Sequence, residues 1–296
     1  MATTLDATQH RLPISLMERL AVPGVFPEGL TRQSFLDHPQ VQELYSHLEA
    51  YQDEFLATDS QWRPELPWPR DALGWWSRRW EYVYALFRGM PQAGESVLDA
   101  GCGITFFPFY LRANGLKVSC CDLDAVLAPA YRDASQVLGL PVDFRTADLA
   151  SLPYADAEFD TVYCISVLEH TTQWDRIVGE FRRVIRPGGK LVLTLDVELS
   201  NPDSAYSVDR IAQLLTVLDD AFDLPPYRPV TEIPEDALTT HSRILEKAEL
   251  SSPHVRGVVD AINFARHPRR YAWARQRLAS EPNLAVFCIT ARRPAS

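Results

Sequence analysis

Two glycines and an acidic residue stand where an apolar run of the chain breaks into a turn. The segment 97–103 reads VLDAGCG, and an apolar stretch typical of a helix follows at 106–111. Gly101 and Gly103 lack a Cβ and can take a positive φ, so a ligand can approach their backbone closely. Unpaired amides at the start of the following helix favour an anionic group. This strand, turn and helix start predict a site for a nucleotide-like cofactor.

The last position of the glycine loop bears on which cofactor binds. A dinucleotide-binding loop has the pattern G-x-G-x-x-G or ends in alanine, because a small residue there lets the helix pack closely on the strand. In this chain Phe106 occupies that place. The sequence therefore disfavours an NAD-dependent oxidoreductase.

Acidic residues follow the next two predicted strands. Residues 117–121 read as a strand and lead to Asp122, roughly 20 residues beyond the glycine turn, where a carboxylate can accept hydrogen bonds from ribose hydroxyls. The structural alternative for Asp122 is to cap the next helix, a role that we assign to Asp124 instead. Asp148 follows the third predicted strand and, taken alone, would be an ordinary turn aspartate.

The fourth block of the sequence is the most specific. Residues 157–170 read AEFDTVYCISVLEH, and residues 181–193 read FRRVIRPGGKLVL, in which Pro187 and two glycines turn a helix into another strand. With the glycine loop, these blocks resemble the class I S-adenosylmethionine (SAM) methyltransferases of the ubiquinone/menaquinone-biosynthesis type. The resemblance covers about residues 79–197, and the family's loop pattern [DE]-x-G-x-G-x-G is matched except at Thr105.

The resemblance implies a Rossmann-like, doubly wound α/β fold with a mostly parallel seven-stranded sheet. We expect an N-terminal helical cap over residues 1–90 and a SAM-binding domain over residues 91–296. Within that domain, residues 197–282 form a helical, substrate-side insertion before the last strands, and residues 283–290 read as a strand of an antiparallel hairpin. The helices predicted in the cap and in the insertion cover residues 32–56, 71–90, 209–222, 235–249 and 253–279.

The family's cofactor contacts can be carried over to matching residues of this chain. By resemblance, Asp148 accepts from the adenine amino group and the apolar residue beside it packs on the ring. The aromatic helix before the first strand could form a lid over the sulfonium charge, with Arg79 holding a carboxylate; its structural alternative is a helix packed on the sheet. The residues expected to contact SAM, or its product S-adenosylhomocysteine, are Asp99, Gly101, Gly103, Thr105, Asp122, Leu123, Asp148, Leu149, Ser166 and Arg79.

The chemistry expected of this site is in-line displacement of the SAM methyl group by a small-molecule acceptor, with the protein supplying orientation and desolvation. A hydroxyl acceptor would require a base, and the end of the fourth strand offers Glu169 and His170. Since "LEH" recurs in the family across many substrates, Glu169 could instead orient the next helix. Asp196 and His241 are second-choice bases, and no metal site is predicted.

Composition sets further limits on the function. The 296 residues suit one α/β domain with an appendage, and a hydrophobic content of 46% with a mean hydropathy of −0.16 is typical of a soluble globular protein. No apolar run reaches the roughly 18 residues of a membrane span, and the N-terminus lacks a signal-peptide pattern. The net charge of −10 argues against a nucleic-acid substrate. The cysteines lie mostly in predicted buried strands, which predicts reduced thiols in a cytoplasmic protein, with Cys120 and Cys121 on opposite sheet faces.

Two other functions fit the same sequence. An enzyme with a SAM-binding fold could catalyse a cyclisation or rearrangement, which only product analysis would separate from methylation. A non-catalytic protein could bind SAM or S-adenosylhomocysteine, although intact Gly101, Gly103, Asp122 and Asp148 argue against a lost cofactor pocket. The sequence leaves open whether O, N, S or C is methylated, and whether the protein is a monomer or a homodimer.

Overall fold

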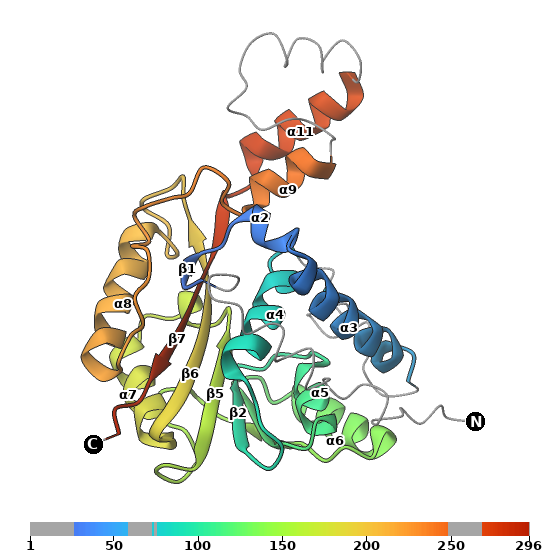
Figure 1. The fold of residues 1–296 in the computed structure, drawn as a ribbon, viewed down its shortest axis with the longest axis vertical. Coiled ribbons are helices and arrows are strands. Elements are labelled where there is room, and N and C mark those ends of the chain that lie inside the picture. Colours follow the sequence, from blue (N-terminus) through green and yellow to red (C-terminus); the bar gives the residue numbers. More distant parts are fainter. Residues whose placement is uncertain (1–26, 59–72, 74–75, 248–267, 296) are drawn as a thin grey trace.

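A computed structural model describes residues 27–58, 73, 76–247 and 268–295. A seven-stranded sheet in the order β1-β7-β6-β5-β2-β3-β4 runs through the molecule (Figure 1). Its strands are β1 (Gly29–Leu30), β2 (Ser96–Ala100), β3 (Lys117–Asp122), β4 (Asp143–Thr146), β5 (Phe159–Ile165), β6 (Ile185–Glu198) and β7 (Leu284–Arg292). Strands β2 to β6 pair in parallel, and β7 runs antiparallel to both of its neighbours. The mostly parallel, Rossmann-like, doubly wound fold is thereby confirmed.

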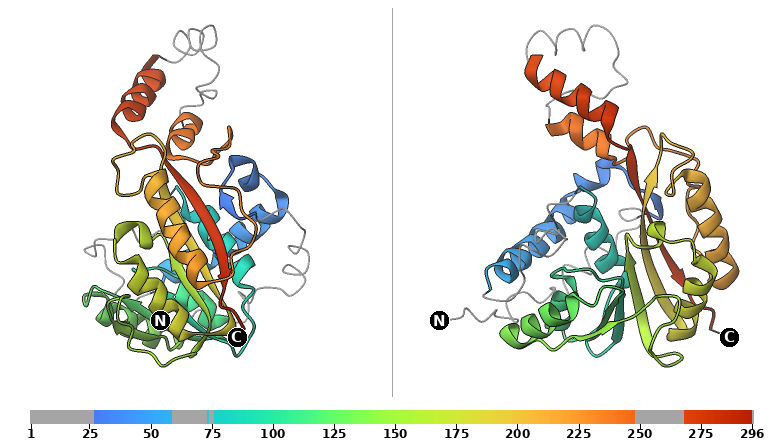
Figure 2. Two further views of the ribbon diagram at one scale, coloured as in Figure 1. Left: turned by 90° about the vertical axis from the view of Figure 1, so that its left-hand side faces the viewer. Right: turned by 180° about the vertical axis from the view of Figure 1, so that it is seen from behind.

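Helices cover both faces of the sheet (Figures 1 and 2). The helices that flank the strands or precede them are α2 (Gln33–Leu36), α3 (Pro39–Leu56), α4 (Arg78–Gly89), α5 (Phe107–Ala113), α6 (Leu127–Leu138), the 3₁₀ turn η1 (Leu168–His170), α7 (Trp174–Val184) and α8 (Val208–Ala221). Helices α7 and α8 lie on one face, and α3 to α6 lie on the other.

Alternating side chains along the strands separate two hydrophobic cores. Val97 and Cys120 point into the core beneath α3 to α6, whereas Leu98 and Cys121 point into the core beneath α7 and α8. The prediction that adjacent cysteines face opposite sides of the sheet is confirmed. All five cysteines of the chain are buried and free.

The first predicted helix is broken into two. Pro39 begins α3, where a missing N–H is harmless, and the preceding residue His38 has the extended backbone that a following proline favours. The His38 Nδ1 accepts a hydrogen bond from the Gln40 amide at 3.4 Å and caps the new helix. A continuous helix over 32–56 was therefore a wrong prediction. The second predicted helix is also shorter, because α4 begins at Arg78; most of residues 59–75 lie outside the described part of the chain.

Aromatic side chains attach the N-terminal helices to the rest of the molecule. Phe55 of α3 stacks on Phe109 of α5 at a centroid distance of 5.4 Å, and Tyr51 meets Tyr110 edge-on at 5.1 Å. On α4, Trp80 is fully buried against the sheet. Most of α4 thus packs on the sheet, as the alternative to the lid role predicted for the aromatic helix. The division at residue 90 stays a prediction.

The edge of the sheet beyond β7 differs from the predicted hairpin. Strand β7 pairs antiparallel with β6 as expected, but its other neighbour is β1 from the N-terminal segment, with Leu30 opposite Phe287. Glu28 fastens this segment, because its carboxylate accepts hydrogen bonds from the Tyr84 hydroxyl and from the Thr290 amide at 3.0 Å. In the described chain, one strand follows the insertion, and an N-terminal strand takes the edge position. The predicted last strand, 283–290, is confirmed as β7.

The insertion at 197–282 supplies three described helices. Helix α8 agrees with the predicted 209–222 to within a residue. Helix α9 (Thr240–Lys247) begins later than the predicted residue 235, and α11 (Pro268–Ser280) ends within a residue of the predicted 279. Residues 248–267 lie outside the described part. Because α9 and α11 lead into the start of β7, which pairs with the end of β6, they project from the carboxyl-end edge of the parallel strands (Figures 1 and 2). Within the described residues, no helix has the length and apolarity needed to cross a membrane.

Candidate functional site

A cavity of about 720 Å³ lies at the carboxyl ends of the parallel strands. This is where open α/β sheets bind ligands, because the loops diverge there. Loops after β2, β3, β4 and β5 line it together with two residues of α4. The predicted cofactor residues that line this cavity are Asp99, Gly101, Gly103, Thr105, Asp122, Leu123, Asp148, Leu149 and Ser166.

The glycine loop leaves room for a ligand against its backbone. Gly101 has a φ of +74°, and a Cβ there would lie 2.7 Å from a methyl group of Val167. Gly103 has a φ of +51°, and a Cβ there would have no atom within 4 Å. The Gly103 amide donates to Asp122 Oδ2 at 2.9 Å, which ties the loop to the end of β3. The loop is therefore held in an open conformation that needs glycine at position 101.

The loop after β3 offers a carboxylate beside an apolar side chain. Asp122 Oδ1 accepts from the Asp124 amide at 3.1 Å, and each carboxylate oxygen keeps a lone pair for a further donor. Asp124 Oδ1 accepts from the Val126 amide at 3.0 Å in the turn before α6. Because Val126 itself is the N-cap of α6, Asp124 stabilises the turn that leads into the helix and does not cap it as predicted. Leu123 is 74% exposed. A large apolar side chain left open beside a carboxylate suits a ring with attached hydroxyl groups.

The loop after β4 repeats this arrangement. Asp148 Oδ1 accepts from the Ala150 amide at 2.9 Å, so the residue does form a side-chain turn. Asp148 and Leu149 both line the cavity as well. Asp148 can therefore form the turn and face a ligand at the same time.

The cationic residue in the cavity is Arg78 rather than Arg79. The Arg79 guanidinium lies over the ring of Tyr45, with its Cζ 5.2 Å from the centroid, and the residue does not line the cavity. Residues three and four apart share a helix face, whereas adjacent residues do not. Arg78 and Tyr82 consequently lie on the cavity side of α4, and Arg79 turns toward α3. The placement of Arg79 in the site was a wrong prediction.

A buried glutamate on the same helix was missed by the sequence reasoning. Glu81 is fully buried, and its Oε2 lies 3.0 Å from Arg78 Nη1. Its Oε1 accepts from the hydroxyls of Ser166 at 2.5 Å and Thr194 at 2.6 Å. Ser166 has a φ of +50°, a conformation that is uncommon for residues other than glycine. Residues 80–87 read WEYVYALF, and the charged Glu81 within this otherwise uncharged run was the signal that could have indicated it.

The two predicted base residues lie at different depths. His170 lines the cavity, and its Nδ1 is 3.2 Å from the Tyr206 hydroxyl oxygen. Partial burial, together with the nearby Arg78 charge, lowers the pKa of His170, so its imidazole is neutral at pH 7. Glu169 lies behind it at 1% exposure and accepts from the Asp196 amide at 3.0 Å, so it holds β6 rather than the next helix.

The two second-choice bases also lie in different places relative to the cavity. Asp196 lines the cavity at the end of β6. His241 does not, since its Nε2 lies 3.0 Å from the Glu281 carbonyl oxygen and joins α9 to the segment before β7. Among the residues that the structure describes, no cluster of three or more His, Cys, Asp or Glu side chains is arranged to hold a metal ion.

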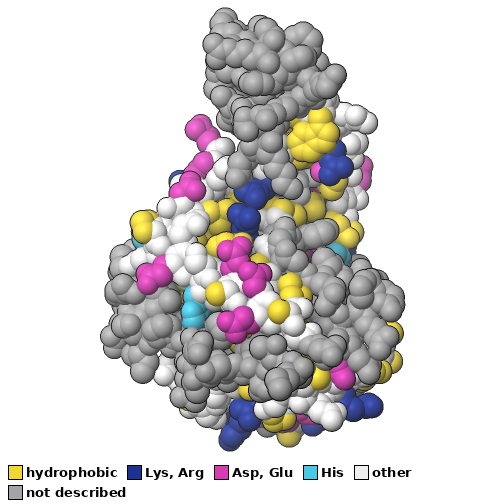
Figure 3. All heavy atoms as spheres, turned by 90° about the vertical axis from the view of Figure 1, so that its right-hand side faces the viewer, with side chains coloured by type: hydrophobic (Ala, Val, Ile, Leu, Met, Phe, Trp, Pro, Cys, Tyr) yellow, Lys and Arg dark blue, Asp and Glu magenta, His cyan; other side chains and the backbone are white. Residues whose placement is uncertain are grey.

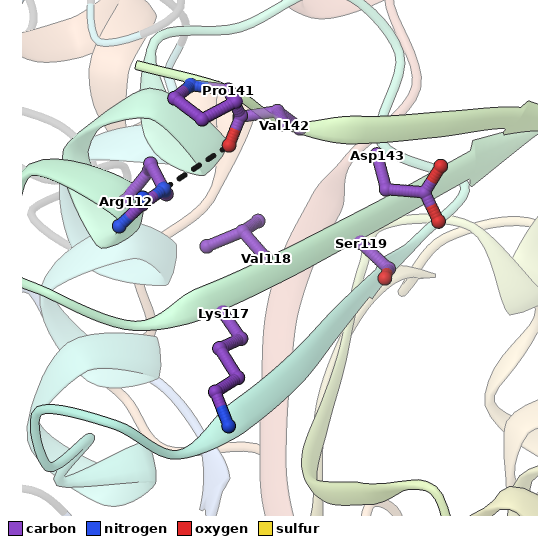
Figure 4. A pocket seen from close by; sticks show the side chains of 7 residues that line it. All are labelled: Arg112, Lys117, Val118, Ser119, Pro141, Val142 and Asp143. Carbon is purple, nitrogen blue, oxygen red and sulfur yellow. Dashed lines mark hydrogen bonds between the residues drawn. The ribbon is translucent and has the colours of Figure 1, made fainter.

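Another hollow, of about 430 Å³, lies at the opposite end of β3 and β4 (Figure 4). It opens at the amino ends of these strands, where Lys117 and Asp143 begin them. Arg112 Nε donates to the Pro141 carbonyl at 3.1 Å along its side. None of the predicted motif residues line it. The larger cavity is therefore the candidate site.

Comparison with known proteins agrees with the geometry. Residues 98–193 match the family model of the methyltransferase domain. This segment is therefore similar to methyltransferase domains, including those of ubiquinone-biosynthesis enzymes. This methyltransferase domain is 34% identical over 117 residues to a ubiquinone biosynthesis O-methyltransferase of Xanthomonas axonopodis pv. citri, covering 39% of this chain and 48% of that protein.

Two other similarities concern the methyltransferase domain and its surroundings. The ubiquinone/menaquinone biosynthesis C-methyltransferase UbiE of Cereibacter sphaeroides is 32% identical over 126 residues, covering 40% of this chain and 50% of that protein. The crystal structure of the [4+2]-cyclase SpnF shares the fold at 22% identity and a TM-score of 0.52, covering 87% of this chain and 97% of that one. The chain spans 37% to 58% of the length of the curated relatives that it matches first.

Proposed function

We propose that this protein is a SAM-dependent methyltransferase that acts on a small molecule. The observation that carries the proposal is the cavity itself, which gathers the glycine loop, Asp122, Asp148 and Ser166 from four separate loops. Free, buried thiols support a cytoplasmic location. On the face shown in Figure 3, acidic side chains gather near the middle and the described basic side chains form no continuous patch, which supports a substrate other than nucleic acid.

The residues of the cavity fit SAM. Asp122 would accept from the ribose hydroxyls, while Asp148 and Leu149 would hold the adenine ring by a hydrogen bond and an apolar wall. The open space at Gly103 leaves room for the ligand against the backbone. Arg78 takes the role first assigned to its neighbour and would hold the carboxylate of the methionine part. Asp99, buried beside the glycine loop, would face the positive charges of that part.

When bound, SAM supplies a methyl group activated by a sulfonium charge. The chain's own part is to align the acceptor, exclude water and accept a proton where the acceptor carries one. For a hydroxyl acceptor, His170 can take that proton, because its lowered pKa leaves it neutral and the Tyr206 hydroxyl fixes its ring.

Replacement of Asp122 by alanine tests the cofactor site. The loss of a charge-assisted hydrogen bond, about 1.5–3 kcal/mol, should weaken SAM and S-adenosylhomocysteine binding by roughly 10- to 100-fold. Calorimetric titration measures this. The matched control is Asp143→Ala, which removes an aspartate from the opposite end of the sheet. Equal affinities of the Asp122→Ala variant and the wild type would contradict the ribose role.

SAM affinity should depend on pH through Asp99. Burial, and secondarily the Asp122 carboxylate, raise the pKa of Asp99 to about 7, while the Arg78 charge opposes the shift. A cationic ligand beside Asp99 requires the ionised form, so binding releases a proton below that pKa. SAM affinity should therefore rise between pH 6 and pH 8 and level off above. In Asp99→Asn this rise should disappear. An unchanged pH profile in the variant would show that Asp99 does not cause the pH dependence of SAM affinity.

A cyclase is the second candidate function, because the shared fold with SpnF extends over most of both chains. The two candidates differ in their products. Methylation adds one carbon to the acceptor and yields S-adenosylhomocysteine in equal amount, whereas a cyclisation leaves the mass of the substrate unchanged. Mass spectrometry of acceptor screens that contain O, N, S and C nucleophiles would separate them. Conversion without S-adenosylhomocysteine would favour the cyclase.

A further inference from the structure

Three carboxyl groups face one guanidinium at the β6 side of the cavity. Arg78 of α4 contacts Glu81 of the same helix, and Glu169 of η1 and Asp196 near the end of β6 are its further acidic neighbours. Burial alone would lower the pKa of Arg78, but these acidic neighbours, Glu81 foremost, raise it above its usual range. The cluster therefore has more negative groups than its guanidinium balances.

One nitrogen of the Arg78 guanidinium, Nη1, is already engaged by Glu81. Arg78 Nη1 lies 3.0 Å from Glu81 Oε2, and the other Glu81 oxygen accepts two hydroxyl hydrogen bonds. Glu81 is thus the one carboxylate of the three whose oxygens are both matched. Because Arg78 and the two hydroxyls pair with Glu81, the Glu169 and Asp196 carboxylates need other hydrogen-bond partners.

Glu169 and Asp196 each keep a buried oxygen that has no hydrogen-bond partner in the described chain, namely Glu169 Oε2 and Asp196 Oδ1. Glu169 is only 1% exposed. The bond from the Asp196 amide uses Glu169 Oε1 and accounts for its role in holding β6, but not for its second oxygen. Unpaired buried carboxylate oxygens destabilise a fold and are found mainly where they serve a ligand or a reaction.

The pair lies at the acceptor side of the cavity. The adenosine and ribose residues of the proposed site follow β3 and β4, whereas Asp196, near the end of β6, lines the cavity with His170. Glu169 does not line the cavity but lies buried next to Asp196, whose amide it binds. Burial is the main cause that raises the pKa of both carboxyl groups. Repulsion from Asp196 adds to the shift of Glu169, and repulsion from Glu81 adds to that of Asp196, whose pKa rises to about 7. Both carboxyl groups therefore bind protons more tightly than usual, and a bound cation would displace these protons.

We propose that the methyl acceptor is a cationic amine whose ammonium group binds to Asp196 and Glu169. This inference rests on the proposed methyltransferase function. In the reaction, one ammonium N–H proton passes to the Asp196 carboxylate, and the freed nitrogen lone pair forms the new N–C bond. The C–S bond breaks as that bond forms, and its electron pair stays on sulfur. The product is a methylated ammonium ion beside neutral S-adenosylhomocysteine, so atoms and charge balance.

Three probes that differ in charge test the inference. Benzylamine, benzyl alcohol and benzoate share a phenyl ring, and each is titrated into the protein with and without saturating S-adenosylhomocysteine. Benzylamine should bind on the order of tenfold or more tightly than benzyl alcohol, and benzoate should bind weakest. Calorimetry in buffers of different ionisation enthalpy should show proton release on benzylamine binding.

Two isosteric variants identify the groups responsible. In Asp196→Asn and in Glu169→Gln, the preference for benzylamine and the proton release should be largely lost, while S-adenosylhomocysteine still binds. Asp143→Asn, at the other end of the sheet, should keep both. If either variant fails to fold, the other still tests the pair.

The possible outcomes distinguish a failure of the amine proposal from a failure of the proposed methyltransferase function. Equal binding of the three probes by a protein that binds S-adenosylhomocysteine would overturn the amine assignment alone, and tighter binding of benzyl alcohol would point to a hydroxyl acceptor instead. Failure to bind S-adenosylhomocysteine would contradict the proposed function. In that case, the titrations of the ligand-free protein still decide whether the pair selects a cation.

Discussion

Replacement of Arg78 by alanine is expected to lower both the stability of the fold and its affinity for SAM. The change leaves the fully buried Glu81 without its ion partner, and removal of one member of a buried pair costs several kcal/mol. Because the Ser166 and Thr194 hydroxyls still donate to Glu81, we expect a loss of about 3 kcal/mol, the lower end of that range. Urea unfolding measures the loss, and calorimetry should show weakened SAM binding.

The neighbouring Arg79 provides the matched control. Within the described part of the chain its guanidinium lies over the Tyr45 ring, so Arg79→Ala should cost about 0.5–1 kcal/mol and leave SAM affinity unchanged. Equal effects of the two substitutions, or a larger effect at Arg79 on SAM binding, would contradict the assignment of Arg78 to the cavity.

Replacement of Gly101 by alanine should have an effect of similar size through a different cause. Its φ of +74° strains any residue with a Cβ by about 1–2 kcal/mol. The added Cβ would also lie 2.7 and 2.8 Å from the two methyl groups of Val167, and overpacking of this kind costs roughly 1–3 kcal/mol. Because Val167 is β-branched and stiff, the loop itself must move. We expect about 3 kcal/mol of lost stability and weak SAM binding.

The variant Gly139→Ala distinguishes the contribution of backbone strain from that of overpacking. It ends α6 with a φ of +65°, and a Cβ there would meet no atom within 4 Å. Gly139→Ala should therefore lose only the backbone contribution, about 1–2 kcal/mol, with normal SAM binding. If Gly101→Ala were no more destabilising than Gly139→Ala in thermal unfolding, the contact with Val167 would not constrain the loop.

The motif loops could be predicted because local rules determine them. A parallel strand followed by a turn and a helix places its loop at the carboxyl edge, so Asp99, Asp122 and Asp148 were bound to meet once the strands were recognised. The side-chain turn at Asp124 before α6 depends on the same kind of local chemistry. These features depend on a few neighbouring residues and on the topology.

Features that depend on distant contacts could not be predicted. The phase of α4 decides between Arg78 and Arg79, and it is set by the packing of Trp80 and Tyr82 rather than by sequence alone. The two-residue strand β1 has no periodic pattern, since it is defined by its pairing with β7. The unmatched oxygens of Glu169 and Asp196 likewise result from the approach of η1 to β6.

Direct titration of the purified protein with SAM, with NAD as the control ligand, tests the central claim most directly. The account predicts binding of SAM and S-adenosylhomocysteine at micromolar scale, roughly 8 kcal/mol of binding free energy, and no binding of NAD. Binding of NAD in preference to SAM, or the absence of SAM binding at millimolar concentration, would contradict a SAM site at the carboxyl ends of β2 to β5.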